Sequence, residues 1–452
     1  MFASGADLQS ANPLITVHPL AKQVQRYVLL TTLVAYDSGL VARPYLAKSF
    51  EWSPDSTVLT FQLNRTVRWH DGAPTTSGDA AWTLNAARNP ATGYPRQADL
   101  AAMAQVENPD DSTLVLRFTV PQKGIPDVLT DLAILPQHLL GNVDLGQVRS
   151  APWNESPVGN GPFKFVSHEP NRRWVFARNP DFPAELGGPP ALDRIVIAVV
   201  DEPTTKLAAL TSGELDFAGI QPAHAEFVRR NPSLEVLSYP LLLTYGIVLN
   251  IRKAPFNDPD VRRAIAWAID RKGIVDGYIY GFGTVATGPV PPGIPGSVEY
   301  PVTGPSLDSA RTHLGDRRIS FELLTVGSGE AALEQMIQAQ LARVGITVNI
   351  RQMELTAFLD RVNSRRPDFE AAVMGTAGDL GLGHIRTLGE IAGIAVPPDA
   401  GAAQRIFADS LPVIFLYHAR GVQGMNRRVH HVRMDLRGEL ATVSDWVAGT
   451  DD

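Results

Sequence analysis

The stretch from Thr244 to Gly283, TYGIVLNIRKAPFNDPDVRRAIAWAIDRKGIVDGYIYGFG, constrains the fold of this chain more than any other segment. Residues 245–251 alternate between two faces, which predicts a strand with one face more apolar than the other. Asp258 then suits the N-cap of a helix, and Pro259 suits its first position. The stretch therefore predicts a strand, a turn and a helix that begins at this proline.

The predicted helix is amphipathic. Val261, Ala264, Ile265, Ala268 and Ile269 fall on one face at helical spacing, so this face is expected to pack against the rest of the protein. A second short helix over residues 274–279 is expected to close at the glycine in position 281.

A second segment predicts a parallel arrangement. Residues 319–326 read as a strand, 331–343 as a helix and 346–350 as another strand. This order implies a parallel α/β unit with a right-handed crossover. The fold class predicted from these patterns is α/β.

Length and composition narrow the class of protein. A chain of 452 residues is long enough for two or three domains at ~150 residues each. Its 44% hydrophobic and 19% charged residues are typical of a globular protein, and a net charge of −7 gives no general electrostatic reason to bind nucleic acid. The absence of cysteine excludes disulfides and thiolate metal sites. No apolar run reaches the ~20 residues that span a bilayer.

The first half of the chain predicts a half-buried hairpin and a capped helix. Residues 58–64 alternate between polar and apolar side chains, and Ser77 or Asp79 is expected to cap a helix. His70 beside Asp71 suggests a catalytic pair, but neighbours in a tight turn cannot easily face one another, so a turn is predicted instead.

Several motifs together resemble one family. The pattern Asn-x-x-x-x-Pro-Phe-x-Asp at 250–258, followed by VRRAIAWAIDR, resembles a segment of the family 5 extracellular solute-binding proteins, the dipeptide- and oligopeptide-binding components of ABC importers. PVGNGPF at 157–163 is similar to a turn of that family, with Asn160 where threonine is usual. The SGELD motif at 212–216 fits as well.

The resemblance implies an α/β fold of the periplasmic-binding-protein type, the type II class with an extra subdomain in the first lobe. Two lobes joined by a two-strand hinge are then expected. Lobe I would cover residues 1–245, with an inserted subdomain at about 46–150. Lobe II would cover 246–411, shortened near 375–403, and 412–452 would return to lobe I.

The function implied by the resemblance is that of an extracytoplasmic solute-binding protein, not an enzyme. It would capture a peptide or similar small polar solute between the lobes and deliver it to a membrane permease. No cofactor and no nucleic acid are expected, and the protein is expected to be a monomer. The location would be periplasmic or extracellular. Because residues 1–4, MFAS, lack a charged and apolar leader, we expect a trimmed export product with an added Met. Composition alone leaves a cytosolic protein open, and the sequence does not tell whether the precursor carries a lipid anchor.

The candidate binding residues also follow from the resemblance. An acidic residue would meet the α-amino group of a peptide, and Asp379 is the candidate for it, although an ordinary loop aspartate fits this position equally well. A cationic group would meet the carboxylate, and Arg420 is the candidate. The other candidates near the ligand are Thr31, Asn160, Tyr245, Asn250, Tyr417 and His418.

Three alternatives remain open. His418, His430 and His431 suggest a nickel or other metal chelate, but adjacent histidines on one strand point to opposite faces. Oligosaccharide binding would use a tryptophan platform, for which Trp153 and Trp267 are available. A hydrolase acting in the cleft is the most distant, because the sequence contains no GxSxG, HExxH or Ser-x-x-Lys motif.

Overall fold

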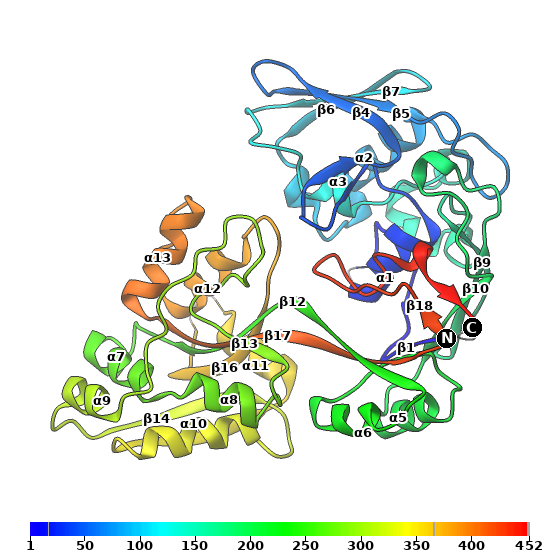
Figure 1. Cartoon of the computed structure of the whole chain (residues 1–452). Coiled ribbons are helices and arrows are strands. Elements are labelled where there is room, and N and C mark those ends of the chain that lie inside the picture. Colours follow the sequence, from blue (N-terminus) through cyan, green and yellow to red (C-terminus); the bar gives the residue numbers. More distant parts are fainter. Residues whose placement is uncertain (17, 365–366, 450–452) are drawn as a thin grey trace. The chain divides into compact units, whose positions relative to one another are not determined.

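The computed structural model describes residues 1–16, 18–364 and 367–449. The chain folds into two compact units, the first made of Met1–Leu237 with Val422–Asp452 and the second of Ser238–Gly421. The chain passes between them within two long strands, β12 (Leu234–Leu249) and β17 (Val413–Asn426) (Figure 1). The lobe limits expected from the sequence remain a prediction, because compact units need not coincide with lobes that move.

The main sheet of the first unit forms around the N-terminal strand. Its order is β17, β11, β1, β10, β9, β8. Strand β1 runs parallel to β10 and β11, whereas β9 is antiparallel to both β10 and β8. The bounds of its strands other than β17 are Phe2–Ser4 (β1), Phe163–Glu169 (β8), Arg173–Arg178 (β9), Arg194–Val199 (β10) and Phe217–Gly219 (β11).

A second, antiparallel sheet of the first unit confirms the predicted hairpin. Its strands are Ala47–Trp52 (β4), Val58–Leu63 (β5), Thr113–Phe118 (β7) and Met103–Asp110 (β6), in that order. Leu59 and Phe61 are buried while Gln62 is exposed, as the alternation predicts. Helix α2 (Ser77–Arg88) covers one face of this sheet (Figure 1).

The start of α2 differs from the predicted cap by one residue. The N-cap is Thr76, and Asp79 is the third helical residue, whose carboxylate accepts a hydrogen bond from the Thr76 N–H at 2.8 Å. This reciprocal arrangement is a capping box, so both sequence signals lie in the first turn. Asp79 also accepts from the Trp69 indole at 3.2 Å, which ties the helix to the turn before it.

The remaining elements of the first unit are short. Helices cover Pro19–Val24 (α1), Val128–Asp131 (α3), Gln137–Leu140 (α4), Pro203–Thr211 (α5) and Ala225–Arg229 (α6), and a π-helix over Gln25–Leu29 continues α1. Two small strand pairs join Val34–Tyr36 (β2) with Ala42–Pro44 (β3) and Val429–His430 (β18) with Val447–Ala448 (β19). Short 3-10 helices cover Pro90–Thr92, Gln97–Leu100, Leu145–Ser150, Pro152–Asn154, Ala184–Leu186, Pro222–His224 and Val443–Asp445.

The second unit is a sheet with the order β15, β14, β16, β12, β17, and β13 pairs with β17. The predicted parallel unit is confirmed, because β14 and β15 are parallel and α10 connects them. Its further strands are Gly283–Val285 (β13), Ile319–Val326 (β14), Ile346–Met353 (β15) and Ala371–Ala377 (β16). Its helices are Pro259–Ala268 (α7), Arg271–Gly277 (α8), Leu307–Leu314 (α9), Ala332–Ala342 (α10), Leu355–Val362 (α11), His384–Ala392 (α12) and Ala400–Ser410 (α13).

The predicted start of α7 is confirmed. Asp258 is the N-cap and accepts from the Asp260 N–H at 2.9 Å, and the apolar face of the helix is buried in the core of this unit. Helix α8 begins three residues earlier than predicted, because Asp270 caps it by accepting from the Gly273 N–H. Among the described residues, none of the helices has the length and apolar character needed to cross a membrane.

Candidate ligand-binding residues

The sequence-predicted residues fall into both units. Thr31 and Asn160 belong to the first unit. The second unit holds Tyr245, Asn250, Asp379, Tyr417, His418 and Arg420. The two groups of candidates therefore belong to separate units.

Thr31 and Asn160 are brought together directly. The Asn160 side-chain oxygen accepts a hydrogen bond from the Thr31 N–H at 2.9 Å, and its amide donates to Thr75 Oγ1 at 3.4 Å. Both residues are fully buried. The buried Thr31 hydroxyl has no hydrogen-bond partner among the described residues.

The glycines beside Asn160 are required for this arrangement. The N–H groups of Asn160 and Gly161 both donate to the Leu29 carbonyl, at 3.1 and 2.9 Å. A Cβ at Gly159 would lie 2.0 Å from that carbonyl oxygen, so no larger residue fits. The PVGNGPF turn thus packs backbone against backbone on the end of the π-helix. Its glycines serve this close approach.

His70 and Asp71 do not form a pair, as predicted. His70 Nε2 lies 3.0 Å from the Gly161 carbonyl oxygen, and its Nδ1 accepts from the Gly159 N–H at 3.2 Å. Burial lowers the pKa of His70 to about 4, so the ring is neutral at physiological pH. Asp71 instead contacts His138, at 2.8 Å.

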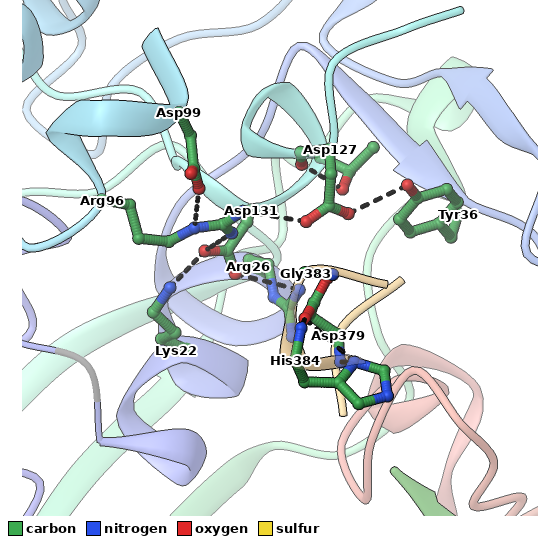
Figure 2. Close-up of polar contacts among 11 residues, drawn as sticks. Lys22, Arg26, Tyr36, Arg96, Asp99, Asp127, Asp131, Asp379, Gly383 and His384 are labelled. Atoms are coloured by element: carbon green, nitrogen blue, oxygen red, sulfur yellow. Dashed lines mark hydrogen bonds and ion pairs between the residues drawn. The ribbon is translucent and has the colours of Figure 1, made fainter. Parts of the chain in front are cut away.

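A buried group of charges fixes the first helix of this unit (Figure 2). Asp131 forms ion pairs with Lys22, with Arg26 at 3.2 Å and with Arg96 at 2.9 Å. Arg96 also binds Asp127, at 2.9 Å. Burial acts to raise the pKa of Asp131, but the three cations outweigh it and hold the value at about 2. These charges neutralise one another, and we assign them a structural role.

In the second unit, a polar network links two of the predicted residues. His418 Nδ1 lies 2.8 Å from the hydroxyl of Thr244, and that hydroxyl donates to the Pro289 carbonyl at 3.4 Å. His384 Nε2 reaches the same carbonyl at 3.3 Å, while its Nδ1 lies 3.1 Å from Asp379. His418 and Asp379 are thereby connected through Thr244, Pro289 and His384, none of which was among the predicted site residues. Burial lowers the pKa of His418 to about 4.

Asp379 also binds the first backbone groups of helix α12, whose N-cap is Gly383. Its two carboxylate oxygens accept from the N–H groups of Gly383 and His384, at 2.9 and 2.8 Å (Figure 2). Burial acts to raise its pKa, but the bonds from His384 and from these backbone groups hold the pKa at about 2. Asp379 is therefore an anion at every physiological pH, and its side chain stays 44% exposed. The five-residue spacing to His384 was the signal that could have revealed the pair.

Tyr245 and Tyr417 stack on each other. Their ring centroids are 4.9 Å apart with an interplanar angle of 16°. Tyr417 is buried and Tyr245 is half-buried. Because consecutive strand residues point to opposite faces, this stack and the Thr244 hydroxyl lie on different faces of β12.

Asn250 and Arg420 make internal contacts. Asn250 is buried, and its amide donates to the Phe369 carbonyl at 3.0 Å, which fixes the end of β12. Arg420 donates through Nε to Ser238 Oγ and through Nη2 to Ser238 O, both at 2.9 Å, and so links the strands that connect the units. The ligand roles of all eight residues remain predictions.

The tryptophans and histidines that suggested an oligosaccharide or a metal chelate lie in both units. Trp153 is buried and donates from its indole to the Val158 carbonyl at 3.1 Å, while Trp267 packs against the core of the second unit. His418 belongs to the second unit, and His430 and His431 to the first. Within residues 1–16, 18–364 and 367–449, no three His, Cys, Asp or Glu side chains are grouped to hold a metal ion.

Comparison with known proteins adds three findings. A model of the bacterial extracellular solute-binding proteins, family 5 Middle, matches residues 42–384. A Brucella abortus relative, named as a candidate ABC transporter peptide-binding protein, is 35% identical over 237 residues, which are 52% of this chain and 44% of that protein. The matched region therefore spans less than half of that relative. The oligopeptide-binding protein AppA of Bacillus subtilis is 25% identical over 372 residues, 77% of this chain and 68% of that protein.

Solved structures share the fold. AppA from Bacillus subtilis, in complex with a nonapeptide, matches with a TM-score of 0.77 at 21% identity over 99% of this chain and 98% of that one. NikZ from Campylobacter jejuni, in complex with Ni(L-His), matches with a TM-score of 0.77 at 18% identity over 99% of this chain and 98% of that one. The predicted fold class is thereby confirmed.

Proposed function

Because the chain belongs to the bacterial extracellular solute-binding proteins, family 5, we propose that it binds a small polar solute outside the cytoplasm and delivers it to the permease of an ABC importer. A peptide is the proposed ligand. The observation that carries the proposal is the family match over residues 42–384, and the AppA complex with a nonapeptide supports the choice of ligand.

In this proposal the protein is a binder and not an enzyme, and it acts as a monomer. Asp379 meets the α-ammonium group of the peptide, since its carboxylate is ionised and partly exposed. Arg420 meets the peptide carboxylate with the guanidinium nitrogens that Ser238 leaves available. Enclosure of the ligand between two lobes, which the resemblance implies, remains a prediction.

A metal chelate is the second candidate ligand. The fold shared with NikZ, which was solved with Ni(L-His), favours it. His418 would serve as a ligand group, since its ring is neutral and a neutral imidazole nitrogen binds metal.

Native mass spectrometry of the purified protein, followed by calorimetry, tests the proposal. Trialanine, a mixed pool of di- to nonapeptides and Ni(L-His) are titrated separately, and bound solute is then released by denaturation. We expect micromolar or tighter peptide binding, with the peptide recovered intact. If only Ni(L-His) binds, the metal chelate and not a peptide is the ligand. Recovery of cleaved peptide would show that the protein is an enzyme.

A further inference from the structure

A buried carboxylate of the second unit has no cationic partner. Glu334, in the first turn of α10, is 7% exposed. It accepts a hydrogen bond from the Thr325 hydroxyl at 2.6 Å. Within the described ranges of the chain, no Lys, Arg or His forms an ion pair with it. Glutamates are almost never this buried unless they are paired, because removing a carboxylate from water is costly.

The position of Glu334 in its helix accounts for part of this burial. A negative charge in the first turn is favoured by the partial positive charge of the helix N-terminus. That effect is worth about 0.3–1 kcal/mol at a surface, and the Thr325 bond fills one of about four acceptor positions of the carboxylate. Most acceptor positions of the Glu334 carboxylate are therefore not filled by hydrogen bonds from the described residues.

Three tyrosines lie on neighbouring elements of this unit: Tyr245 on β12, Tyr417 on β17, and Tyr278 directly after α8, where a Cβ at Gly277 would lie 3.5 Å from Met336 of α10. The pKa of Tyr245 is raised by burial and by the charge of Glu334, and the pKa of Tyr278 is raised by burial, Glu334 and Tyr245. Burial, the two other tyrosines and Glu334 raise the pKa of Tyr417. Among the described residues, Glu334 is thus the acid whose charge acts on all three phenols. Tyr245 and Tyr278 are half-buried, so the group is open to solvent on their side.

The backbone next to Tyr245 is shaped for its ring. A Cβ at Gly375, on the neighbouring strand β16, would lie 2.9 Å from Tyr245 Cζ and 3.1 Å from its Cε2. The glycine therefore lets the ring lie flat against the sheet and stack on Tyr417. Two parallel rings offer a π-face of negative potential, which attracts cations.

We propose that Glu334 with Tyr245, Tyr278 and Tyr417 recognises an organic cation, an ammonium or guanidinium group carried by the ligand. This inference rests on the proposed function and names its substrate class, which is that of cationic solutes such as peptides with a lysine or arginine side chain. The carboxylate supplies charge, and the rings supply faces that tolerate either cation.

The test uses small probes first, because they do not depend on peptide binding. n-Butylguanidinium and its neutral isostere n-butylurea are titrated into protein with ¹³C-labelled tyrosine rings and followed by NMR. The expected result is that n-butylguanidinium shifts the ring signals of the three tyrosines and that n-butylurea does not. Glu334→Gln, which keeps an oxygen for Thr325, is expected to abolish the response. Glu330→Gln, an exposed neighbour, serves as the matched control and is expected to leave it unchanged.

Peptides then identify which cation is recognised. Ala-Lys-Ala, Ala-norleucine-Ala and their N-acetylated forms are compared by calorimetry. If the site binds a side-chain cation, Ala-Lys-Ala binds about tenfold or more tightly than Ala-norleucine-Ala, and Glu334→Gln loses this difference. If the site binds the α-ammonium group, N-acetylation weakens the binding of both peptides instead.

Two results overturn the inference. One is equal binding of charged and neutral probes by the wild-type protein, and the other is a preference for cations that survives in Glu334→Gln. Failure of the proposed function is distinguishable, since no peptide would then bind whatever its charge, while n-butylguanidinium would still report on the site.

Discussion

The ring of Tyr245 lies 4.9 Å from the ring of Tyr417, on two strands that both continue into the other unit. The stack depends on the missing side chain at Gly375, where a Cβ would come within 3.2 Å of Leu243 as well as touching Tyr245. Aromatic stacking in this second unit is therefore a consequence of one glycine on β16.

Gly375→Ala is expected to displace the Tyr245 ring and to lower the free energy of unfolding by about 1–3 kcal/mol, as overpacking does. Urea unfolding and the near-ultraviolet circular dichroism of the tyrosines measure the two effects. Gly329→Ala is the control, because a Cβ there meets no atom within 4 Å. A Gly375→Ala protein with unchanged stability and spectrum would show that the ring has room to move.

Asp131→Asn is expected to lower the free energy of unfolding by about 3 kcal/mol at pH 7, since it removes the carboxylate that pairs with Lys22 and Arg26, while Arg96 keeps Asp127. Asp131 is 9% exposed, so solvent screens little of this effect. Asp308→Asn, at a side chain that is 98% exposed, is the control. A difference below about 0.5 kcal/mol between the two variants would exclude a stabilising role for the charge group.

The pH dependence of the stability that this charge group contributes follows from the depressed pKa of Asp131. The folded value is about 2 and the unfolded value about 3.8, so its stabilisation is fully present above pH 3.8 and is lost as the pH falls towards 2. Acid unfolding of the wild-type protein should show this loss, and Asp131→Asn should not. Parallel curves for both proteins would mean that other carboxylates govern acid unfolding.

The lowered pKa of His418 predicts that stability also depends on pH in a higher range than for Asp131. Its pKa is about 4 in the folded protein against 6.5 when unfolded, so below pH 6.5 only the unfolded state gains the proton. Stability therefore falls between pH 6.5 and 4, by up to about 1.4 kcal/mol per pH unit from this residue. Urea unfolding at several pH values should give a smaller slope for His418→Asn. His431→Asn, at an exposed side chain, should keep the wild-type slope.

Local sequence signals predicted the regular elements well. Asp258 and Pro259 marked the start of α7, and the alternation of residues 58–64 marked β5, because capping and burial act within a few residues. Helices α12 and α13 were missed. The segment as a whole is rich in Gly and Ala and was interpreted as irregular, although Ile385 and Leu388 of α12 follow helical spacing and pack into the unit, as Phe407 of α13 does.

The candidate site was predictable only in part. His418 and Tyr417 were named from the resemblance, but Thr244, which contacts His418, and Glu334, whose charge acts on Tyr417, lie on other elements and reach them through the tertiary fold. Asp379 differs, since its partner His384 lies only five residues further along the chain. Asn160 illustrates the opposite case. Its motif was recognised, but its contact with Thr31, on a segment 129 residues away, depends on how the turn packs against the π-helix.

Asp379→Asn separates a ligand role from a capping role. Asparagine keeps one of the two oxygens that accept from the N–H groups of Gly383 and His384, so α12 should persist and the free energy of unfolding should fall by about 1 kcal/mol. If the carboxylate meets the α-ammonium group, trialanine should bind at least about tenfold more weakly, because a charge-assisted hydrogen bond is lost. N-acetyl-trialanine should show no such change. Asp399→Asn, at the N-cap of α13, is the control and should leave both affinities as they are. Equal weakening of the free and acetylated peptides would assign Asp379 to the structure of α12 alone.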